Sequence, residues 1–252
     1  MDVVAYAVCY NEAQLLPYYI RHYQSFCSKV VIYDNYSNDG SKQIARSMGA
    51  EVRLFGNSQL DDREYLKIKN NCWKGSGADF IIVGDLDEFI YHPDIVNHLK
   101  WCKSKKIALP SIEGYNIYSE ITPTTKGQIY EQIRTGFYDK NFSKQAIFSP
   151  KIKEINFGFG CHTNRAKGVK GGKMYLLHYR CIGGVQDMIN RHRMYAMRMC
   201  DFNKQRKFGA HYFRNKEQLL KEWQKNINLS KELLFLSNET PDIQSYQETT
   251  RT

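Results

Sequence analysis

The chain has 252 residues, of which 42% are hydrophobic, and a formal net charge of +10. This length suits one large α/β domain, alone or with a helical appendage, with enough apolar residues for a core. No stretch reaches the roughly 20 apolar residues of a membrane-spanning helix. The N-terminus lacks the basic head and long apolar run of a signal peptide, so we expect a cytoplasmic protein, either free or peripheral to the inner face of the membrane.

The seven cysteines are odd in number, and no two form a CxxC pair. A disulfide framework or a structural zinc site is therefore not expected. We expect buried or partly buried free thiols.

The positive charge lies in the C-terminal third of the chain. Residues 1–100 carry 10 Lys/Arg and 13 Asp/Glu, whereas residues 162–225 carry 15 Lys/Arg and 4 Asp/Glu. Such a surface could bind anionic lipid, a phosphorylated acceptor, a diphosphate or nucleic acid, or could simply be solvated. No nucleic-acid-binding motif is present.

The first hundred residues alternate strand and helix patterns. Val3–Cys9 is an apolar run typical of a strand buried on both faces. Asn11 is expected to cap the helix that follows it. Further strands are predicted at 30–33, 51–54 and 80–83, with helices at 41–48 and through 65–72. This order predicts a mostly parallel sheet with helices on both faces, and ligands bound beyond the carboxyl ends of its strands.

After residue 105 the pattern changes to strands without regular helical crossovers. The predicted elements are strands at 107–118, 128–137 and 173–179, a helix at 185–203 and a last helix at 216–236. Residues 238–252 are polar and expected to fray. The C-terminal helices would form a basic extension of the α/β domain.

The most informative motif is GDLDEF at 84–89, directly after an apolar strand. It places three carboxylates, Asp85, Asp87 and Glu88, within four residues. Because these three negative charges repel one another, we expect a bound cation to offset their repulsion. Oxygen ligands favour Mg²⁺ or Mn²⁺. The alternative is an acidic turn that caps the next helix.

Three motifs together resemble the glycosyltransferase family 2-like group, whose members have the GT-A fold. They are CYNE at 9–12, IYDNYSND at 32–39 and DLDEF at 85–89. The resemblance continues at 69–73, 160–164 and 176–180, and so covers roughly residues 3–200. It implies a Rossmann-like sheet that binds a nucleotide-sugar, with a donor half at 1–105, an acceptor half at 106–183, basic helices at 184–236 and a flexible tail at 237–252.

The resemblance also implies roles for individual residues. Asp34 would read the donor base, Asp85 would lie near the ribose or sugar, and Asp87 would bind the metal. A carboxylate suits a base N–H or a ribose hydroxyl because it only accepts hydrogen bonds. The expected donor-binding residues are Asn11, Glu12, Asp34, Asp39, Lys69, Asn71, Asp85 and Asp87, and Asp85 is a second expected metal ligand. Asn11 and Asp34 could instead be turn caps.

A histidine is expected to complete the metal site, and imidazole favours Mn²⁺ over Mg²⁺. His178 is the first candidate, because it ends an apolar strand before a Gly-Gly turn. His162 competes for the role. Nearby Arg180, Arg191 and Arg193 could contact a diphosphate in bidentate fashion or lie on a solvated helix face.

The catalytic base is the least determined role. A transferase that inverts the sugar's configuration needs a carboxylate near the acceptor hydroxyl. Glu113, Glu131, Asp139 and Glu154 are available in the acceptor half, and Glu113 is preferred because it follows a predicted strand. Whether transfer inverts or retains configuration stays open.

These features predict a metal-dependent glycosyltransferase that moves a sugar to a glycan or lipid-diphosphate-linked acceptor in surface polysaccharide synthesis. One alternative is a nucleotidyltransferase, but the loop at 9–12 is acidic and lacks the glycines that hold a triphosphate. Another is a non-catalytic basic module that binds nucleic acid or anionic membrane, which leaves the acidic motif unexplained. The sugar, the nucleobase and the linkage stay open.

Overall fold

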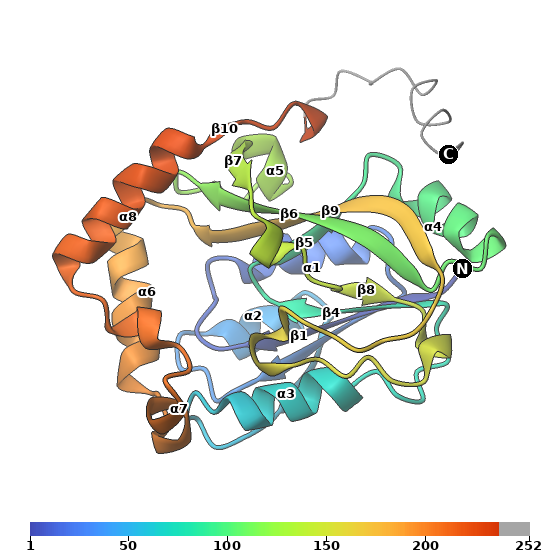
Figure 1. The fold of residues 1–252 in the computed structure, drawn as a ribbon, viewed down its shortest axis with the longest axis horizontal. Coiled ribbons are helices and arrows are strands. Elements are labelled where there is room, and N and C mark those ends of the chain that lie inside the picture. Colours follow the sequence, from blue (N-terminus) through green and yellow to red (C-terminus); the bar gives the residue numbers. More distant parts are fainter. Residues whose placement is uncertain (237–252) are drawn as a thin grey trace.

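A computed structural model describes residues 1–236 and contains two five-stranded sheets (Figure 1). The first sheet has the order β3 (Glu51–Leu54), β2 (Lys29–Asp34), β1 (Val3–Cys9), β4 (Phe80–Asp85) and β8 (Ile147–Phe148). The first four strands are parallel, and β8 pairs with β4 in the antiparallel sense. The predicted α/β class with a mostly parallel sheet is confirmed.

The second sheet has the order β10 (Lys231–Glu232), β7 (Thr135–Tyr138), β6 (Leu109–Tyr118), β9 (Lys170–Cys181) and β5 (Glu88–Tyr91). In this sheet β6 and β9 are parallel, and the other pairs are antiparallel. The register places His178 of β9 between Asn116 of β6 and Glu88 of β5. Since β5 follows β4 after two residues, the acidic motif joins the two sheets.

Helices pack on both faces of the first sheet and against the second sheet. They are α1 (Leu16–Gln24), α2 (Ser41–Ser47), α3 (Asp62–Asn71), α4 (Ile95–Ser104), α5 (Ile129–Gln132), α6 (Val185–Met197), α7 (Asp201–Arg206) and α8 (Lys216–Leu229). Alternate residues of β1 point to opposite faces. Val3 and Ala5 belong to the core cluster that contains α1, whereas Val4 and Tyr6 belong to the cluster that contains α3.

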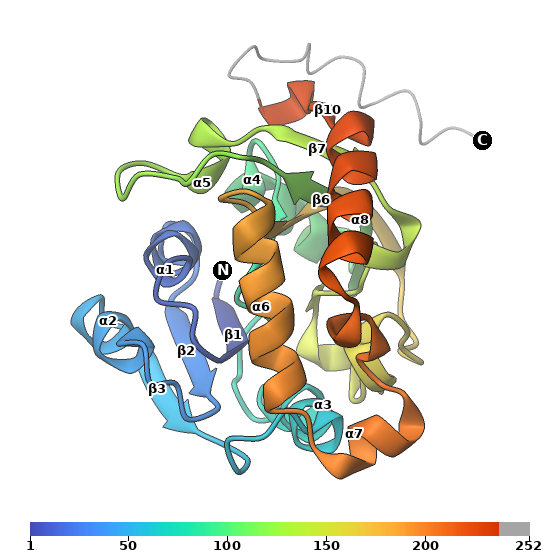
Figure 2. The same cartoon turned by 90° about the vertical axis from the view of Figure 1, so that its left-hand side faces the viewer.

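The C-terminal helices lie across the end of the molecule where the two sheets meet. Figure 2 shows α6 and α8 side by side, with α7 beside α3. The helix α6 packs against both β9 and α8. These helices therefore close one side of the space beyond the ends of β1 and β4.

Several predicted elements need correction. Asn11 does not cap α1: it has a left-handed backbone with φ 52°, and the N-cap residue is Leu15. The predicted strand at 128–137 is the short helix α5 followed by β7. The last helix ends at Leu229 rather than at residue 236. The helix α4 and the strand β5 were not predicted.

The predicted helix at 185–203 is interrupted after Met197. There the chain pairs with the segment before α3: the amide of Leu60 donates to the Arg198 carbonyl at 2.8 Å, and the amide of Cys200 donates to the Leu60 carbonyl at 3.2 Å. This tertiary pairing outweighs the helical pattern and separates α6 from α7.

All seven cysteines are free, and six of them are buried, as expected. None of the helices in residues 1–236 is long and apolar enough to cross a membrane. The tail predicted at 237–252 lies outside the described residues.

Candidate functional site

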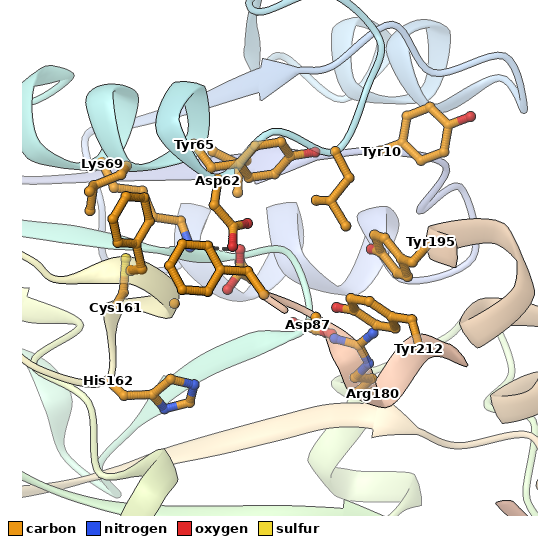
Figure 3. Close-up of a pocket in the computed structure, with 18 of the residues that line it drawn as sticks. Tyr10, Asp62, Tyr65, Lys69, Asp87, Cys161, His162, Arg180, Tyr195 and Tyr212 are labelled. Carbon is orange, nitrogen blue, oxygen red and sulfur yellow. Dashed lines mark hydrogen bonds and ion pairs between the residues drawn. The ribbon is translucent and has the colours of Figure 1, made fainter. Parts of the chain in front are cut away.

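A cavity of about 380 Å³ lies beyond the carboxyl ends of β1 and β4 (Figure 3). It is lined by Tyr10 and Glu12 after β1, by the acidic turn after β4, by α3 and by the ends of β9 and α6. The sequence predicts that the loops after β1, β2 and β4 converge at one crevice, and those after β1 and β4 do. The loop after β2 does not line the cavity. Its Asn35 accepts hydrogen bonds from Tyr65, which lines the cavity, and from Arg198.

Two buried lysines neutralise part of the acidic turn. Lys69 Nζ lies 2.7 Å from Asp85 Oδ1, and Lys144 pairs with Glu88 while its Nζ lies 3.9 Å from Asp85 Oδ2. Burial alone would raise the pKa of Asp85, but Lys69 and Lys144 hold it below its ordinary value. The expected cation is thus not needed to offset repulsion at Asp85 and Glu88. No local pattern indicates this role of Lys144, which lies 56 residues from Glu88 in the sequence.

Asp87 differs from its neighbours because no lysine pairs with it. Its side chain is buried, and Oδ2 lies 3.6 Å from His178 Nε2. Burial favours the neutral acid, yet His178, Arg180 and Arg191 lower the pKa of Asp87. Its other oxygen, Oδ1, is buried without a hydrogen-bond partner among the described residues. A buried unpaired carboxylate oxygen is costly and indicates a missing partner.

The donor set at Asp87 can be tested against the expected metal. Residues 1–236 contain no cluster of three or more His, Cys, Asp or Glu side chains placed to hold an ion. Asp87 and His178 therefore offer two protein ligands, and Asp85 is engaged by Lys69. Mg²⁺ and similar ions are commonly held by one or two protein groups plus substrate phosphates and water. The pair fits that mode of binding.

His162, the competing histidine, also lines the cavity but is exposed. One of its ring nitrogens, Nδ1, lies 2.6 Å from the carbonyl of Asn141. Its side chain points into the cavity in Figure 3. No contact joins it to Asp87, so His178 is the histidine that the fold brings to the acidic turn.

Arg180 also lines the cavity, next to two stacked tyrosines. Its guanidinium carbon is 5.0 Å from the ring centre of Tyr195 and 4.9 Å from that of Tyr212, and the rings themselves are 4.9 Å apart. The nitrogen Nη2 is buried without a hydrogen-bond partner among the described residues. No sequence motif indicates Tyr195 and Tyr212, because they lie on separate segments, α6 and the short helical turn at 210–213.

Asp62 is a cavity carboxylate that sequence reasoning missed. It begins α3 and has no salt bridge in the described part of the chain. Burial raises its pKa, against smaller lowering effects of Asn203 and Lys69. Because Asn203 comes from α7, 141 residues away, no local pattern could show this contact.

Most of the predicted donor loop holds itself together rather than lining the cavity. Asn11 and Asn38 exchange two hydrogen bonds, and Asp39 accepts from Ala13 and Ser41. Asp34 accepts from the amide of Ser37 at 2.9 Å, while its Oδ2 is buried without a partner in residues 1–236. The contact with Ser37 agrees with the turn-capping alternative for Asp34, whereas Asn11 joins two loops that are distant in sequence.

Glu12 does line the cavity, and it pairs with Arg191 of α6 at 2.5 Å. Two other predicted residues do not line it. Asn71 is exposed and donates to the carbonyl of Lys67. Glu113 is half-exposed, and its Oε1 lies 2.9 Å from Lys173 Nζ.

A scan of protein-family models finds no match for this chain, and no curated protein matches it. Solved structures are similar at low identity. Staphylococcus aureus TarS 1-349 in complex with UDP has 15% identity and a TM-score of 0.45, covering 89% of this chain and 71% of that one. Glucosyl-3-phosphoglycerate synthase from Mycobacterium tuberculosis, in complex with Mn²⁺, UDP and product, has 15% identity and a TM-score of 0.35.

The match to glucosyl-3-phosphoglycerate synthase covers 45% of this chain and 44% of the synthase, which is less than half of each. CMP:2-keto-3-deoxy-manno-octonic acid synthetase complexed with CTP is also similar, at 11% identity and a TM-score of 0.32. Likeness at this level spans more than one reaction, so the function has to be argued from the site.

Proposed function

We propose that the chain is a divalent-cation-dependent glycosyltransferase that uses a nucleoside-diphosphate sugar. The observation that carries this proposal is the Asp87–His178 pair, with the unpartnered Asp87 Oδ1 and the unpartnered Arg180 Nη2 in one cavity. A carboxylate oxygen and a guanidinium nitrogen that both lack hydrogen-bond partners are complementary to a metal–diphosphate group. The motifs at 9–12, 32–39 and 85–89 support the same function.

Each side chain has a proposed part in binding the donor. Asp87 and His178 would hold Mn²⁺ or Mg²⁺, which neutralises charge on the leaving nucleoside diphosphate. Arg180 would donate to the diphosphate, for which a planar guanidinium is well suited. Asp62 would accept hydrogen bonds from ribose hydroxyls, and Asp34 Oδ2 from a base N–H.

The loop after β1 favours transfer over nucleotide activation. A nucleotidyltransferase would be expected to hold the triphosphate on a glycine-rich basic loop. Here that loop contains Tyr10 and Glu12, and Glu12 already has its cation in Arg191. The acceptor that we propose is a glycan or a lipid-diphosphate-linked sugar in surface polysaccharide synthesis, reached at the cytoplasmic face of the membrane.

The donor can be identified by thermal-shift measurements with UDP, GDP, CDP and dTDP, each with and without Mn²⁺. A ligand that binds only the folded state raises the melting temperature. We expect one nucleotide to stabilise the protein strongly only when Mn²⁺ is present. Nucleotide-sugar hydrolysis or transfer with the matching donor then tests catalysis.

Asp87→Asn is the decisive variant, with Asp201→Asn as its control. Both remove one carboxylate charge, but the Asp201 side chain is 89% exposed and lies on α7 outside the cavity lining. We expect Asp87→Asn to abolish the Mn²⁺-dependent shift and the transfer, and Asp201→Asn to retain both. Full activity of Asp87→Asn, or of the native protein in excess EDTA, would refute the proposal.

A further inference from the structure

A series of side-chain contacts runs from the buried Asp87 away from the cavity to the partly buried Asp139. His178 Nε2 faces Asp87, and His178 Nδ1 lies 2.8 Å from Asn116 Oδ1. The amide nitrogen of Asn116 donates to Asp139 Oδ2, also at 2.8 Å. Asn116 and His178 are directly paired positions of the neighbouring strands β6 and β9, so the backbone register brings their side chains together.

Asp139, at the far end of these contacts, determines which atoms donate and which accept. An ionised carboxylate can only accept, so Asp139 must face the amide nitrogen of Asn116. The amide oxygen of Asn116 then faces His178, and only a protonated Nδ1 can donate to it. A neutral His178 therefore carries its hydrogen on Nδ1. Its Nε2 lone pair and Asp87 Oδ2, which lie 3.6 Å apart, are then both acceptors, and a cation between them would satisfy both.

The turn that carries Asp139 is held against β6. The amide of Asp139 donates to the carbonyl of Gly114 at 2.9 Å, and Ser143 Oγ accepts from the amide of Gly114 at 3.0 Å. A Cβ at residue 114 would lie 2.2 Å from backbone atoms of Phe142, so this approach requires glycine. Phe142 itself stacks on the ring of His178, with centroids 4.3 Å apart and an interplanar angle of 22°.

We propose that Asp139 and Asn116 are positioning residues that fix the tautomer and the ring orientation of His178, so that Nε2 is a preformed ligand for the divalent cation. The inference rests on the proposed function for the identity of the ligand, but its geometry is a property of the unliganded protein. Outer partners of metal-ligating histidines typically account for 10- to 100-fold in metal affinity. Glu113, the base candidate from the sequence, has no place in this chain of contacts.

The tautomer can be read directly from ¹⁵N chemical shifts of the two ring nitrogens in the metal-free protein. We would record long-range ¹H–¹⁵N spectra in alkaline buffer, where imidazoles are neutral, and assign His178 by comparison with His178→Gln. The inference predicts a protonated Nδ1 and an unprotonated Nε2. A native His178 with its hydrogen on Nε2 would overturn it, and the variant serves only to assign the signal.

Variants then test the far end of the chain. Asp139→Ala frees the Asn116 amide to rotate, so both tautomers of His178 should be populated and Mn²⁺ affinity should fall by about 10- to 100-fold. Asp79→Ala is the matched control, because it also removes a partly buried, hydrogen-bonded carboxylate, at the end of β4 away from the cavity. It should leave the spectrum and the affinity unchanged.

Mn²⁺ binding would be measured by electron paramagnetic resonance in the presence of UDP. If Asp139→Ala keeps both the Nδ1–H signal and the native affinity, the positioning role is wrong. If the native protein shows the Nδ1–H tautomer but binds no Mn²⁺, the proposed function fails while the hydrogen-bond assignment stands. The two measurements thus separate the two ideas.

Discussion

Buried ionisable side chains decide much of the chemistry of this protein at the scale of single residues. Around the acidic turn, Asp85 and Glu88 have lysine partners, whereas Asp87 faces an imidazole and keeps one oxygen unpaired. Three carboxylates that look alike in sequence thus have two different environments. The residue with the unpaired oxygen is the one to which we assign the metal.

A second buried histidine makes stability depend on pH. His22 of α1 is 3% exposed, and its Nε2 lies 2.8 Å from the carbonyl of Ile90. Burial lowers its pKa from 6.5 to about 4, against the smaller effect of that carbonyl. The native state therefore binds this proton less readily than the unfolded chain. The resulting stabilisation is complete above pH 6.5 and is lost as the pH falls toward 4.

We predict that acidification from pH 7 to pH 4 lowers the free energy of unfolding by about 3 kcal/mol through His22 alone. His22→Gln can still donate to Ile90 but does not titrate, so its loss of stability should be smaller by that amount. Urea unfolding at several pH values measures the difference. Identical pH dependence in both proteins would show that His22 is not responsible.

At the scale of elements, the helix α6 links the C-terminal third to the donor side. Arg191 of α6 pairs with the buried Glu12 after β1, and Arg198 beyond its end donates to Asn35 after β2 and stacks on Tyr10. Two of the arginines expected on a basic face therefore point inward. They stabilise loops of the first sheet, far away in the sequence.

Removing Arg191 should show how much the Arg191–Glu12 pair contributes to the stability of the protein. We expect Arg191→Leu to cost about 3–5 kcal/mol of stability, because Glu12 would remain buried without its cation. Combining it with Glu12→Gln should recover part of the loss. Lys221→Leu on α8 is the control: its pair with Glu217 is exposed and should cost at most about 1 kcal/mol. Equal losses in the two single variants, measured by urea unfolding, would contradict the link.

Local patterns predicted the elements whose burial follows a simple period. The strands β1 and β3 have the predicted bounds, and α2 and β4 differ by one or two residues, because apolar runs and turn residues mark their ends. The break between α6 and α7 depends on pairing with Leu60, which is distant in sequence. The sequence likewise led to Asp87 and His178, but not to Asp62, Lys144 or Asn116, whose partners come from other segments.

At the scale of the whole molecule, the basic excess is divided between interior and surface. Arg180 lines the cavity and Arg191 pairs with the buried Glu12, while Lys204, Arg206 and Lys207 are exposed on α7 and directly after it. Phe208 and Gly209, the next residues, line the cavity. This exposed basic segment is therefore placed to attract an anionic acceptor or its membrane, as we propose for the acceptor side.

We predict that the native protein co-sediments with vesicles containing phosphatidylglycerol at low salt, and that reversing Lys204, Arg206 and Lys207 to Glu prevents it. The attraction should weaken with salt, since screening lengths fall to about 8 Å at physiological ionic strength. Reversal of Lys100, Lys105 and Lys106 gives the same change of net charge on exposed residues outside the cavity lining. If that control loses binding equally, net charge rather than the segment is responsible.

The most direct test of the whole account is a crystal structure with Mn²⁺ and the nucleoside diphosphate that stabilises the protein. Anomalous scattering at the manganese edge locates the ion independently of the surrounding density. We predict one peak bonded to Asp87 and to His178 Nε2, with the diphosphate bridging that ion and Arg180. A nucleotide bound in the cavity without an ion at Asp87 and His178, or an ion held elsewhere, would contradict the account.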